Sequence, residues 1–381
     1  MNSTRMLVVL ALGISLFAAC SDDGTLPPPP DKPAQIEYDI VQSRGTGLPS
    51  SEVTAFINGP GGEFWVGTRG GIARYSSHND NDADSIVTEL TGLPHPQVTS
   101  MVEHDGSIYV GTWGGGVGIY NIQDGTWEQL RPGENGLVDG YISDIAVSAP
   151  TENRIYFSSN DGVSVLDPTV GTFTHVSTVA PTCPDNGPFT DECNDEDDFD
   201  TPALQQLVSC VEVLDTLGIV EHWYGPRVEL RPSEIEPGKH GIMVTKASMS
   251  YKYTMVNSGL LEPNVNDIYW DRQTNTVWVG YATKGLSNVD TAAKTWTTYD
   301  LSDGLASNTV VAITRADDHA TSKSAIWAAT QGGLSKLVDG SHTWQSYNTG
   351  GGLPSSRLHS LYNDGTHLWV GFVDAGAIRI K

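Results

Sequence analysis

The sequence is poor in basic residues and in cysteine. It contains 21 lysines and arginines against 46 aspartates and glutamates, which gives a formal net charge of −25. Nucleic-acid phosphates need a basic surface, so this charge argues against binding to DNA or RNA. The four cysteines include no CxxC pair. Neither a thiolate zinc site nor a haem-attachment motif is therefore indicated.

Long hydrophobic runs and common catalytic signatures are lacking as well. The only extended apolar run, Met6–Phe17, has twelve residues and is too short to span a bilayer. The sequence has no HExxH, GxSxG, phosphate-loop or dinucleotide motif. Ten histidines are scattered, and His95 and His359 have no partner that the sequence reveals. We therefore assign no catalytic residue, and the sequence favours a non-enzymatic role.

The first 34 residues predict an exported, lipid-anchored segment. Residues 1–19 have the pattern of a signal peptide, with Arg5 as the only side-chain charge. Residues 16–20, LFAAC, resemble a bacterial lipobox with phenylalanine where leucine is usual, so we expect lipidation of Cys20. An ordinary secretory signal is the alternative. Residues 20–34 are acidic and then proline-rich, as in an extended tether.

A repeated unit organises the rest of the chain. Its Gly-Leu pair begins at residues 47, 92, 136, 259, 304 and 352, so most steps are 44 to 48 residues and one is 123. Short alternating runs between Gly-rich turns are typical of antiparallel strands. About four strands per unit at a fixed period predict an all-β fold, a β-propeller. We expect the central aromatic of each unit in the core, namely Trp65, Tyr109, Tyr156, Trp278, Trp327 and Trp369.

The unit resembles the two-component-regulator propeller repeat. Residues 47–75, GLPSSEVTAFINGPGGEFWVGTRGGIARY, follow its pattern of a GLP turn, a Trp-containing strand and a Gly-Gly turn. The units at 92, 304 and 352 match well, and those at 136 and 259 are looser. The resemblance implies a ligand-sensing or scaffolding role, because such repeats commonly form the periplasmic half of hybrid sensor kinases. This chain shows neither a kinase nor a spanning helix, so we do not expect it to signal across a membrane alone.

The two ends of the repeat region are expected to complete one blade together. Residues 36–41 read as an outermost strand, and the last unit stops at residue 381 after its third strand. The 123-residue step leaves room for a degenerate blade, with residues 207–214 as its innermost strand, and for an irregular acidic insertion at about 180–240. The main prediction for residues 35–381 is thus a seven-bladed ring. Six blades with a small insertion subdomain are the alternative.

The insertion contains three of the four cysteines. Cys183 and Cys193 bracket a short acidic loop and form a candidate disulfide in an extracytoplasmic protein. Cys210 either stays free or replaces one of the pair, and the sequence leaves this open.

Two turns of each repeat should open on the same face, because the strands of a blade alternate in direction. They are the turn that leads into the first strand and the turn between the second and third strands. Their variable residues predict a channel mouth that binds a glycan, a peptide or a partner protein. Solvated turns without a ligand are the alternative. The candidates are Arg69, Trp113, Tyr141, Asn160, Asn264, Lys284, Gln331, Arg357 and Asp374, with Glu52, Gln97 and Thr309 beside them.

These features predict a lipoprotein of the bacterial cell envelope, anchored in the outer membrane on its periplasmic or surface side. A polysaccharide lyase or hydrolase on the same scaffold is the alternative function. Asp80, Asp82 and Asp84 alternate as in calcium loops, but Ser85 and Thr91 stand where an EF-hand has its glycine and its last glutamate. Calcium is therefore a weak candidate here and in the acidic run 191–200, and we expect no other cofactor.

Overall fold

The computed structural model describes residues 35–134, 136–148, 153–159, 162–176, 207–214, 220–226, 241–246, 249–318, 323–339, 341 and 343–381. Ala34–Lys381 form one compact unit by themselves. The predicted signal peptide, tether, Cys20, Cys183 and Cys193 lie outside the described residues, and the predicted insertion is described only in part. None of the described residues belongs to a helix that is long and apolar enough to cross a membrane.

The described strands form seven four-stranded antiparallel sheets, which we number in ring order from sheet 1 to sheet 7. Short 3-10 turns lie between some consecutive strands: η1 (Arg44–Thr46), η2 (Pro60–Gly62), η5 (Leu301–Asp303) and η6 (Thr349–Gly351). Sheet 1 contains β2 (Val53–Asn58), β3 (Phe64–Thr68), β4 (Gly71–Tyr75) and β5 (Ser85–Val87); sheet 2 contains β6 (Val98–His104), β7 (Ser107–Thr112), β8 (Gly116–Asn121) and β9 (Trp127–Leu130); sheet 3 contains β10 (Ile142–Val147), β11 (Ile155–Ser159), β12 (Gly162–Asp167) and β13 (Thr172–Val176); sheet 4 contains β14 (Leu207–Leu214), β15 (Val220–Pro226), β16 (Gly241–Lys246) and β17 (Met249–Thr254); sheet 5 contains β18 (Val265–Asp271), β19 (Thr276–Tyr281), β20 (Leu286–Asp290) and β21 (Thr295–Tyr299); sheet 6 contains β22 (Val310–Asp318), β23 (Lys323–Thr330), β24 (Gly333–Val338) and β25 (Gln345–Tyr347); sheet 7 contains β26 (Leu358–Asn363), β27 (Leu368–Phe372), β28 (Ala377–Ile380) and β1 (Tyr38–Gln42).

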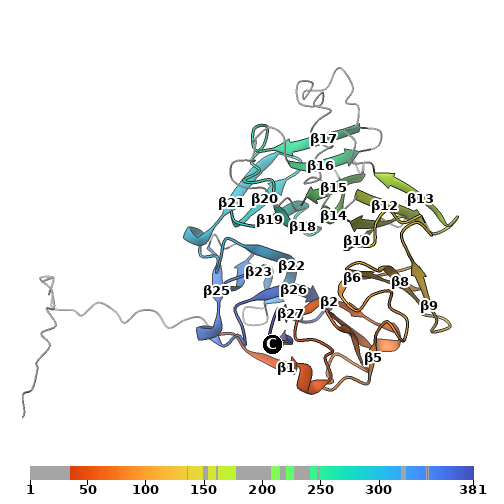
Figure 1. The fold of residues 1–381 in the computed structure, drawn as a ribbon. Helices are drawn as coiled ribbons and strands as arrows, with labels where there is room; N and C mark the ends of the chain where they lie inside the picture. Colours follow the sequence, from red (N-terminus) through yellow and green to blue (C-terminus); the bar gives the residue numbers. More distant parts are fainter. Residues whose placement is uncertain are drawn as a thin grey trace, which may run out of the picture. The chain divides into compact units, whose positions relative to one another are not determined.

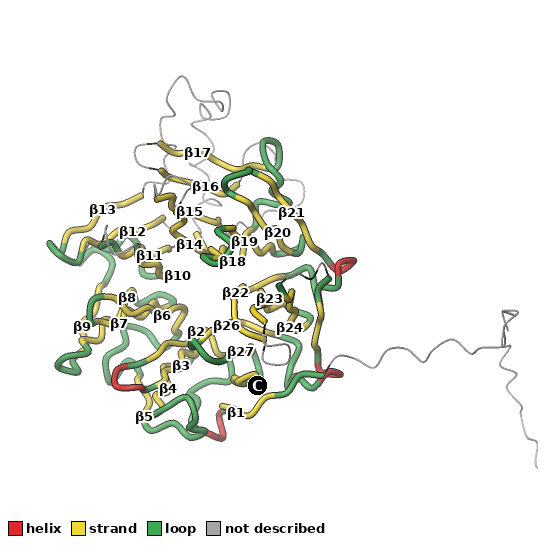
Figure 2. Tube along the Cα trace, turned by 180° about the vertical axis from the view of Figure 1, so that it is seen from behind, coloured by secondary structure: helices red, strands yellow, loops and turns green. Residues whose placement is uncertain are grey.

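The sheets are arranged as a ring. The first strand of each sheet packs beside the first strand of the next, and β26 of sheet 7 packs beside β2 of sheet 1. Figures 1 and 2 show these innermost strands around a common centre. The predicted all-β propeller is therefore confirmed.

Sheet 4 differs from the other six sheets in its sequence. Six sheets, 1 to 3 and 5 to 7, carry the repeated motif, and they correspond to the six blades of the alternative prediction. Sheet 4 occupies the segment where the repeat is degenerate and is described mainly by its backbone. Its strand β14 lies between β10 and β18, and its Ile242 and Tyr253 pack against sheet 5. The segment thus forms sheet 4, which lies between sheets 3 and 5 in the ring.

Strands from the two ends of the propeller close the ring in sheet 7. β1 pairs antiparallel with β28, with Tyr38 opposite Ile380 and Gln42 opposite Ala377. The Lys381 N–H donates a 3.0 Å hydrogen bond to the Glu37 carbonyl, which extends this ladder. Figure 1 shows the orange β1 beside the blue C-terminal strands. The predicted closure by shared strands is confirmed.

The GLP turn holds each repeat to its neighbour by burying its leucine. Leu48, Leu93, Leu137, Leu260, Leu305 and Leu353 are all buried. Before the first of them, Ser43 and Thr46 form a capping box on η1, and Gly47 ends η1 with φ of 94°. A residue with a Cβ is strained in this left-handed conformation, which explains the glycine before the leucine.

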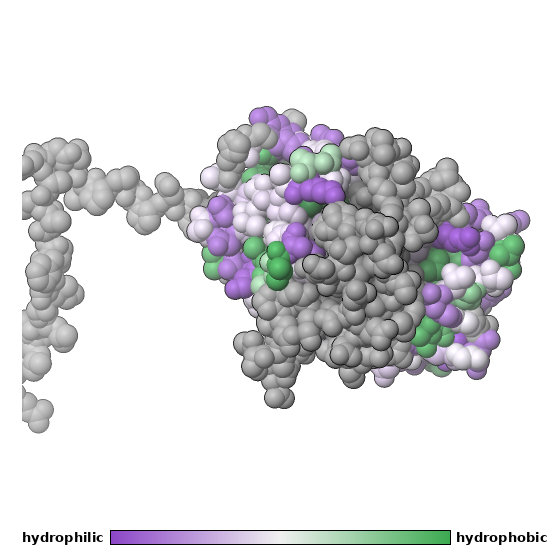
Figure 3. All heavy atoms as spheres, turned by 90° about the horizontal axis from the view of Figure 1, so that it is seen from above, coloured by the Kyte–Doolittle hydropathy of each residue, from purple (hydrophilic) through white to green (hydrophobic). Residues whose placement is uncertain are grey.

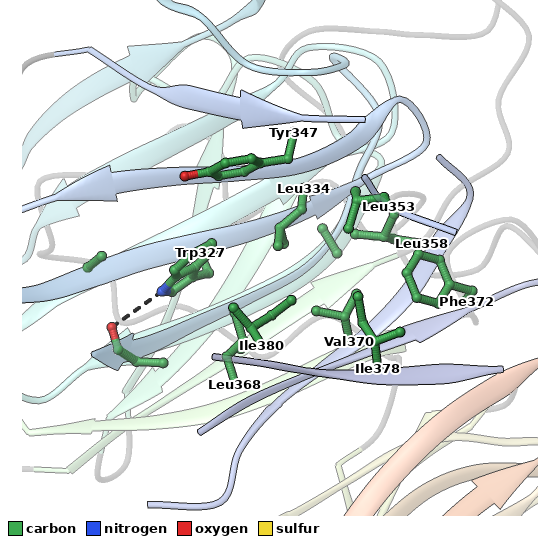
Figure 4. Packing of buried hydrophobic residues seen from close by; sticks show 13 residues of the cluster. Trp327, Leu334, Tyr347, Leu353, Leu358, Leu368, Val370, Phe372, Ile378 and Ile380 are labelled. Atoms are coloured by element: carbon green, nitrogen blue, oxygen red, sulfur yellow. Dashed lines mark hydrogen bonds between the residues drawn. The ribbon is translucent and has the colours of Figure 1, made fainter. Parts of the chain in front are cut away.

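The hydrophobic core consists of clusters between neighbouring sheets. Six clusters are described, and each combines residues of two adjacent sheets. Figure 4 shows the one between sheets 6 and 7, where Trp327 faces Leu368 and Ile380 and donates a hydrogen bond to the Ala316 carbonyl at 3.3 Å. All six central aromatics of the repeats are buried, so their predicted role in the core is confirmed.

In the view of Figure 3, the described hydrophobic residues lie in small separate areas among hydrophilic and near-neutral ones.

Candidate functional site

The two variable turns of each repeat lie on the same face and are joined by a main-chain hydrogen bond. The N–H after the second strand donates to a carbonyl of the turn that leads into the first strand. This bond recurs in five described sheets: Arg69 to Glu52 (3.2 Å), Trp113 to Gln97 (2.9 Å), Ala282 to Asn264 (3.1 Å), Gln331 to Thr309 (3.0 Å) and Val373 to Arg357 (2.9 Å). We call the side chains of these turns the rim. Three of these bonds join two candidate residues directly, and in sheets 5 and 7 the candidates Lys284 and Asp374 lie in the same turns as the donors Ala282 and Val373.

A second set of main-chain bonds joins the rim turns of adjacent sheets. The Gly376 N–H of sheet 7 donates to the Ser51 carbonyl of sheet 1 at 2.9 Å, and Gly285 of sheet 5 donates to Asn308 of sheet 6 at 2.8 Å. Between sheets 2 and 3, Gly116 donates to the Gly140 carbonyl at 3.0 Å. The backbones of the rim turns therefore form a hydrogen-bonded framework that holds the variable side chains in place.

Every innermost strand carries a β-bulge next to the rim. Its register against the second strand skips one residue after the first pair, and the skipped residues are Thr54, Thr99, Ser143, Val208, Asn266, Val311 and His359. Bulges re-aim a side chain and often lie next to functional sites. The hydroxyl oxygens of Thr54 and Thr99 are buried and have no hydrogen-bond partner among the described residues.

Trp113 and Tyr141 form an exposed aromatic pair where the rims of sheets 2 and 3 meet. Their backbones form an isolated antiparallel bridge, and their rings lie 5.5 Å apart in an edge-to-face arrangement. They are 42% and 45% exposed. The turn after Trp113 requires two glycines: Gly114 has a positive φ of 114°, and a Cβ on Gly115 would lie 2.6 Å from the Pro94 carbonyl group.

The rims of sheets 7 and 1 meet at a junction that we call the closing seam, and the side chains there are charged. Arg69 Nε lies 2.7 Å from Glu52 Oε1, and His359 Nε2 lies 3.6 Å from the same oxygen. Arg357 Nη1 and Asp374 Oδ2 form a longer pair at 3.4 Å. These five side chains are the seam cluster. Glu52 and His359 are more than 300 positions apart in the sequence, so sequence analysis could not reveal that they are neighbours.

The other candidate residues of the rim lie outside these two groups. The Gln331 side chain donates to the Leu358 carbonyl of sheet 7 at 3.4 Å. Lys284 is exposed in a turn that the buried Glu262 holds in place, because its carboxylate accepts hydrogen bonds from the Thr283 and Lys284 N–H groups at 2.5 and 3.1 Å. Sequence analysis missed Glu262, since its role depends on a turn 21 residues away. Asn264 lies in the turn of sheet 5, and Asn160 is outside the described residues.

Two of the three proposed calcium ligands accept hydrogen bonds from serines. Asp84 Oδ2 accepts a 2.6 Å hydrogen bond from Ser76, and Asp80 Oδ2 accepts one from Ser77 at 3.1 Å. Within the described part of the chain, no group of three or more histidine, cysteine or acidic residues is arranged to hold a metal ion. Calcium binding by Asp80, Asp82 and Asp84 remains a prediction, and the run 191–200 lies outside the described residues.

The fold and its rim define this chain as a β-propeller with a variable polar and aromatic face. No protein-family model matches the chain, and no curated protein matches its sequence. Solved structures do match its fold. The extracellular domain of the hybrid two-component system BT3049 from B. thetaiotaomicron matches with a TM-score of 0.63 at 16% identity, over 92% of this chain and 42% of that one.

Two further structures have the same architecture. PorZ of Porphyromonas gingivalis, a surface component of the type-IX secretion system, matches with a TM-score of 0.57 at 15% identity, over 88% of this chain and 46% of its own. YCF48 from Cyanidioschyzon merolae matches with a TM-score of 0.57 at 12% identity, over 88% of this chain and 97% of its own. This chain therefore spans less than half the length of the first two. At such low identity the likeness shows the fold alone.

Proposed function

We propose that the propeller is a binding module of the bacterial cell envelope and that its rim binds a glycan. The observation that carries this proposal is the exposed edge-to-face pair of Trp113 and Tyr141. An aromatic side chain held on a rigid backbone offers a large apolar contact at low cost in conformational entropy. Its flat face suits the apolar face of a sugar ring.

Three further observations support a ligand at the rim. The main-chain bonds within and between repeats hold the rim turns rigid, and preorganised sites lose less entropy on binding. The buried hydroxyls of Thr54 and Thr99 have hydrogen-bonding capacity that no described residue uses. Finally, the neighbours in fold include an extracellular domain of a two-component system and a surface secretion component. Anchoring through Cys20 and the tether 20–34 would place such a module in the envelope.

A glycan array probed with residues 35–381 tests this function, with a peptide array in parallel. We expect binding to glycans that falls at least about tenfold in Trp113→Ala and Tyr141→Ala. Val170→Ala is the control, because Val170 is exposed in the turn between β12 and β13, which opens on the opposite face. Binding to peptides alone would reassign the rim to a peptide partner. Binding that survives both aromatic substitutions would refute the proposal.

An enzyme on the same rim is the second candidate, and the approach of His359 to Glu52 favours it. A carboxylate beside an imidazole is a common arrangement for acid–base catalysis. Polysaccharide cleavage, followed as new reducing ends or unsaturated products, would have to disappear in His359→Ala to support a lyase or hydrolase.

A further inference from the structure

The turns that carry the seam cluster are joined by main-chain hydrogen bonds, although they come from both ends of the propeller. The Val373 N–H bonds to Arg357, Gly376 bonds to Ser51, and Arg69 bonds to Glu52 through their main chains. These three bonds connect four successive turns across the closing seam. The charged side chains of the turns are therefore held beside one another by the backbone.

Glu52 fixes the orientation of the Arg69 side chain. Its Nε forms the 2.7 Å ion pair with Glu52 Oε1, while the side chain as a whole is 54% exposed and Glu52 is 18% exposed. The guanidinium has five N–H donors in a fixed plane, and the described residues engage it only through Glu52. Its terminal Nη groups therefore remain for a planar acceptor, and the carboxylate fixes their direction.

Two more donors flank Arg69. Arg357 is 59% exposed, and its only described side-chain partner is Asp374 at 3.4 Å. His359 lies on the bulge of β26 and shares Glu52 Oε1 with Arg69. On the neighbouring bulge, the buried Thr54 hydroxyl has no described partner. That oxygen is buried, so the exposed donors for a ligand at the seam are the two arginines.

We infer that the seam cluster binds a carboxylate of the ligand, so that the rim recognises an acidic glycan, one that contains uronic acid. This inference rests on the proposed glycan function. Arg69 would hold the carboxylate by its two Nη groups, with Arg357 as a further donor. The overall charge of −25 repels dense polyanions, so we expect a ligand whose carboxylates are few and spaced apart.

Calorimetric titration with galactose and galacturonate oligomers of equal length tests the inference. We expect the galacturonate oligomer to bind more tightly, and Arg69→Gln to reduce its affinity by about tenfold to a hundredfold. The same substitution should leave the affinity for the neutral oligomer unchanged. Arg357→Gln should act in the same direction with a smaller effect, which provides a second variant if Arg69→Gln is poorly folded.

Arg272→Gln is the matched control. It removes the same charge from an exposed arginine in the turn between β18 and β19, on the opposite face. If it weakens galacturonate binding as much as Arg69→Gln does, the effect is one of overall charge and the inference fails. It also fails if both oligomers bind equally well, or if a sulfated galactose oligomer binds as tightly as galacturonate. If neither oligomer binds and the glycan array is also empty, the proposed function itself is refuted.

Discussion

Truncation of Trp327 gives a direct test of the ring packing. Trp327 is 2% exposed between sheets 6 and 7, and its ring stacks on Tyr347 at 6.4 Å. The Lys336 ammonium lies 5.4 Å from the ring centre and forms a buried 3.0 Å ion pair with Asp318. Trp327→Ala would therefore open a cavity beneath a buried ion pair.

The expected loss follows from these contacts. A buried tryptophan replaced by alanine costs about 3–5 kcal/mol, and the lost cation–π contact adds about 1 kcal/mol. We expect Trp327→Ala to lower the free energy of unfolding by about 4–6 kcal/mol. Trp327→Phe should lose less, because it leaves a smaller cavity.

Urea denaturation followed by circular dichroism measures this loss, with Trp113→Ala as the matched control. Trp113 is 42% exposed on the rim, so its removal should cost less than about 1 kcal/mol. A loss below about 1 kcal/mol in Trp327→Ala, or equal losses in both variants, would show that the described register between sheets 6 and 7 is wrong.

Three further predictions concern the closing sheet. Deleting Ile36–Val41 removes β1 from its pairing with β28 and should lower the melting temperature of the whole ring; an unchanged melting temperature would mean that this strand does not close it. Gln42 is fully buried and its amide has no partner among the described residues, so Gln42→Met should raise the free energy of unfolding by about 1–2 kcal/mol, and a loss in urea denaturation would contradict this. Burial raises the pKa of Asp364, but hydrogen bonds from two backbone N–H groups and the Trp369 indole lower it by more, so the folded pKa lies below its usual value. The ionised carboxylate therefore stabilises the fold above about pH 4, and this contribution is lost as the pH falls through the folded pKa. Asp364→Asn should lower the free energy of unfolding by about 1.5–3 kcal/mol at neutral pH. It should also weaken the fall of the melting temperature between neutral and acidic pH. A pH dependence equal to that of the unmodified protein would show that Asp364 does not contribute to it.

The repeating architecture could be predicted from the amino-acid sequence alone. The period of the Gly-Leu pairs, the alternating strands and the buried aromatics are local signals, and each corresponds to one short segment of the structure. The closure by residues 36–41 followed from the same pattern, because a unit without its first strands needs partners from elsewhere. The degenerate segment around residues 207–254 was harder to interpret, since its motif is absent although its backbone forms a sheet.

Which side chains lie beside one another on the rim could be seen only in the folded ring. The turns were predictable, but the neighbours of a side chain across two sheets depend on the ring and not on the sequence distance. Trp113 meets Tyr141 because the turns of two adjacent sheets are bridged by their backbones. Glu52 meets His359 because the ring closes between sheets 7 and 1. Closure of the chain in space brings together residues from its two ends, and no local pattern records such a contact.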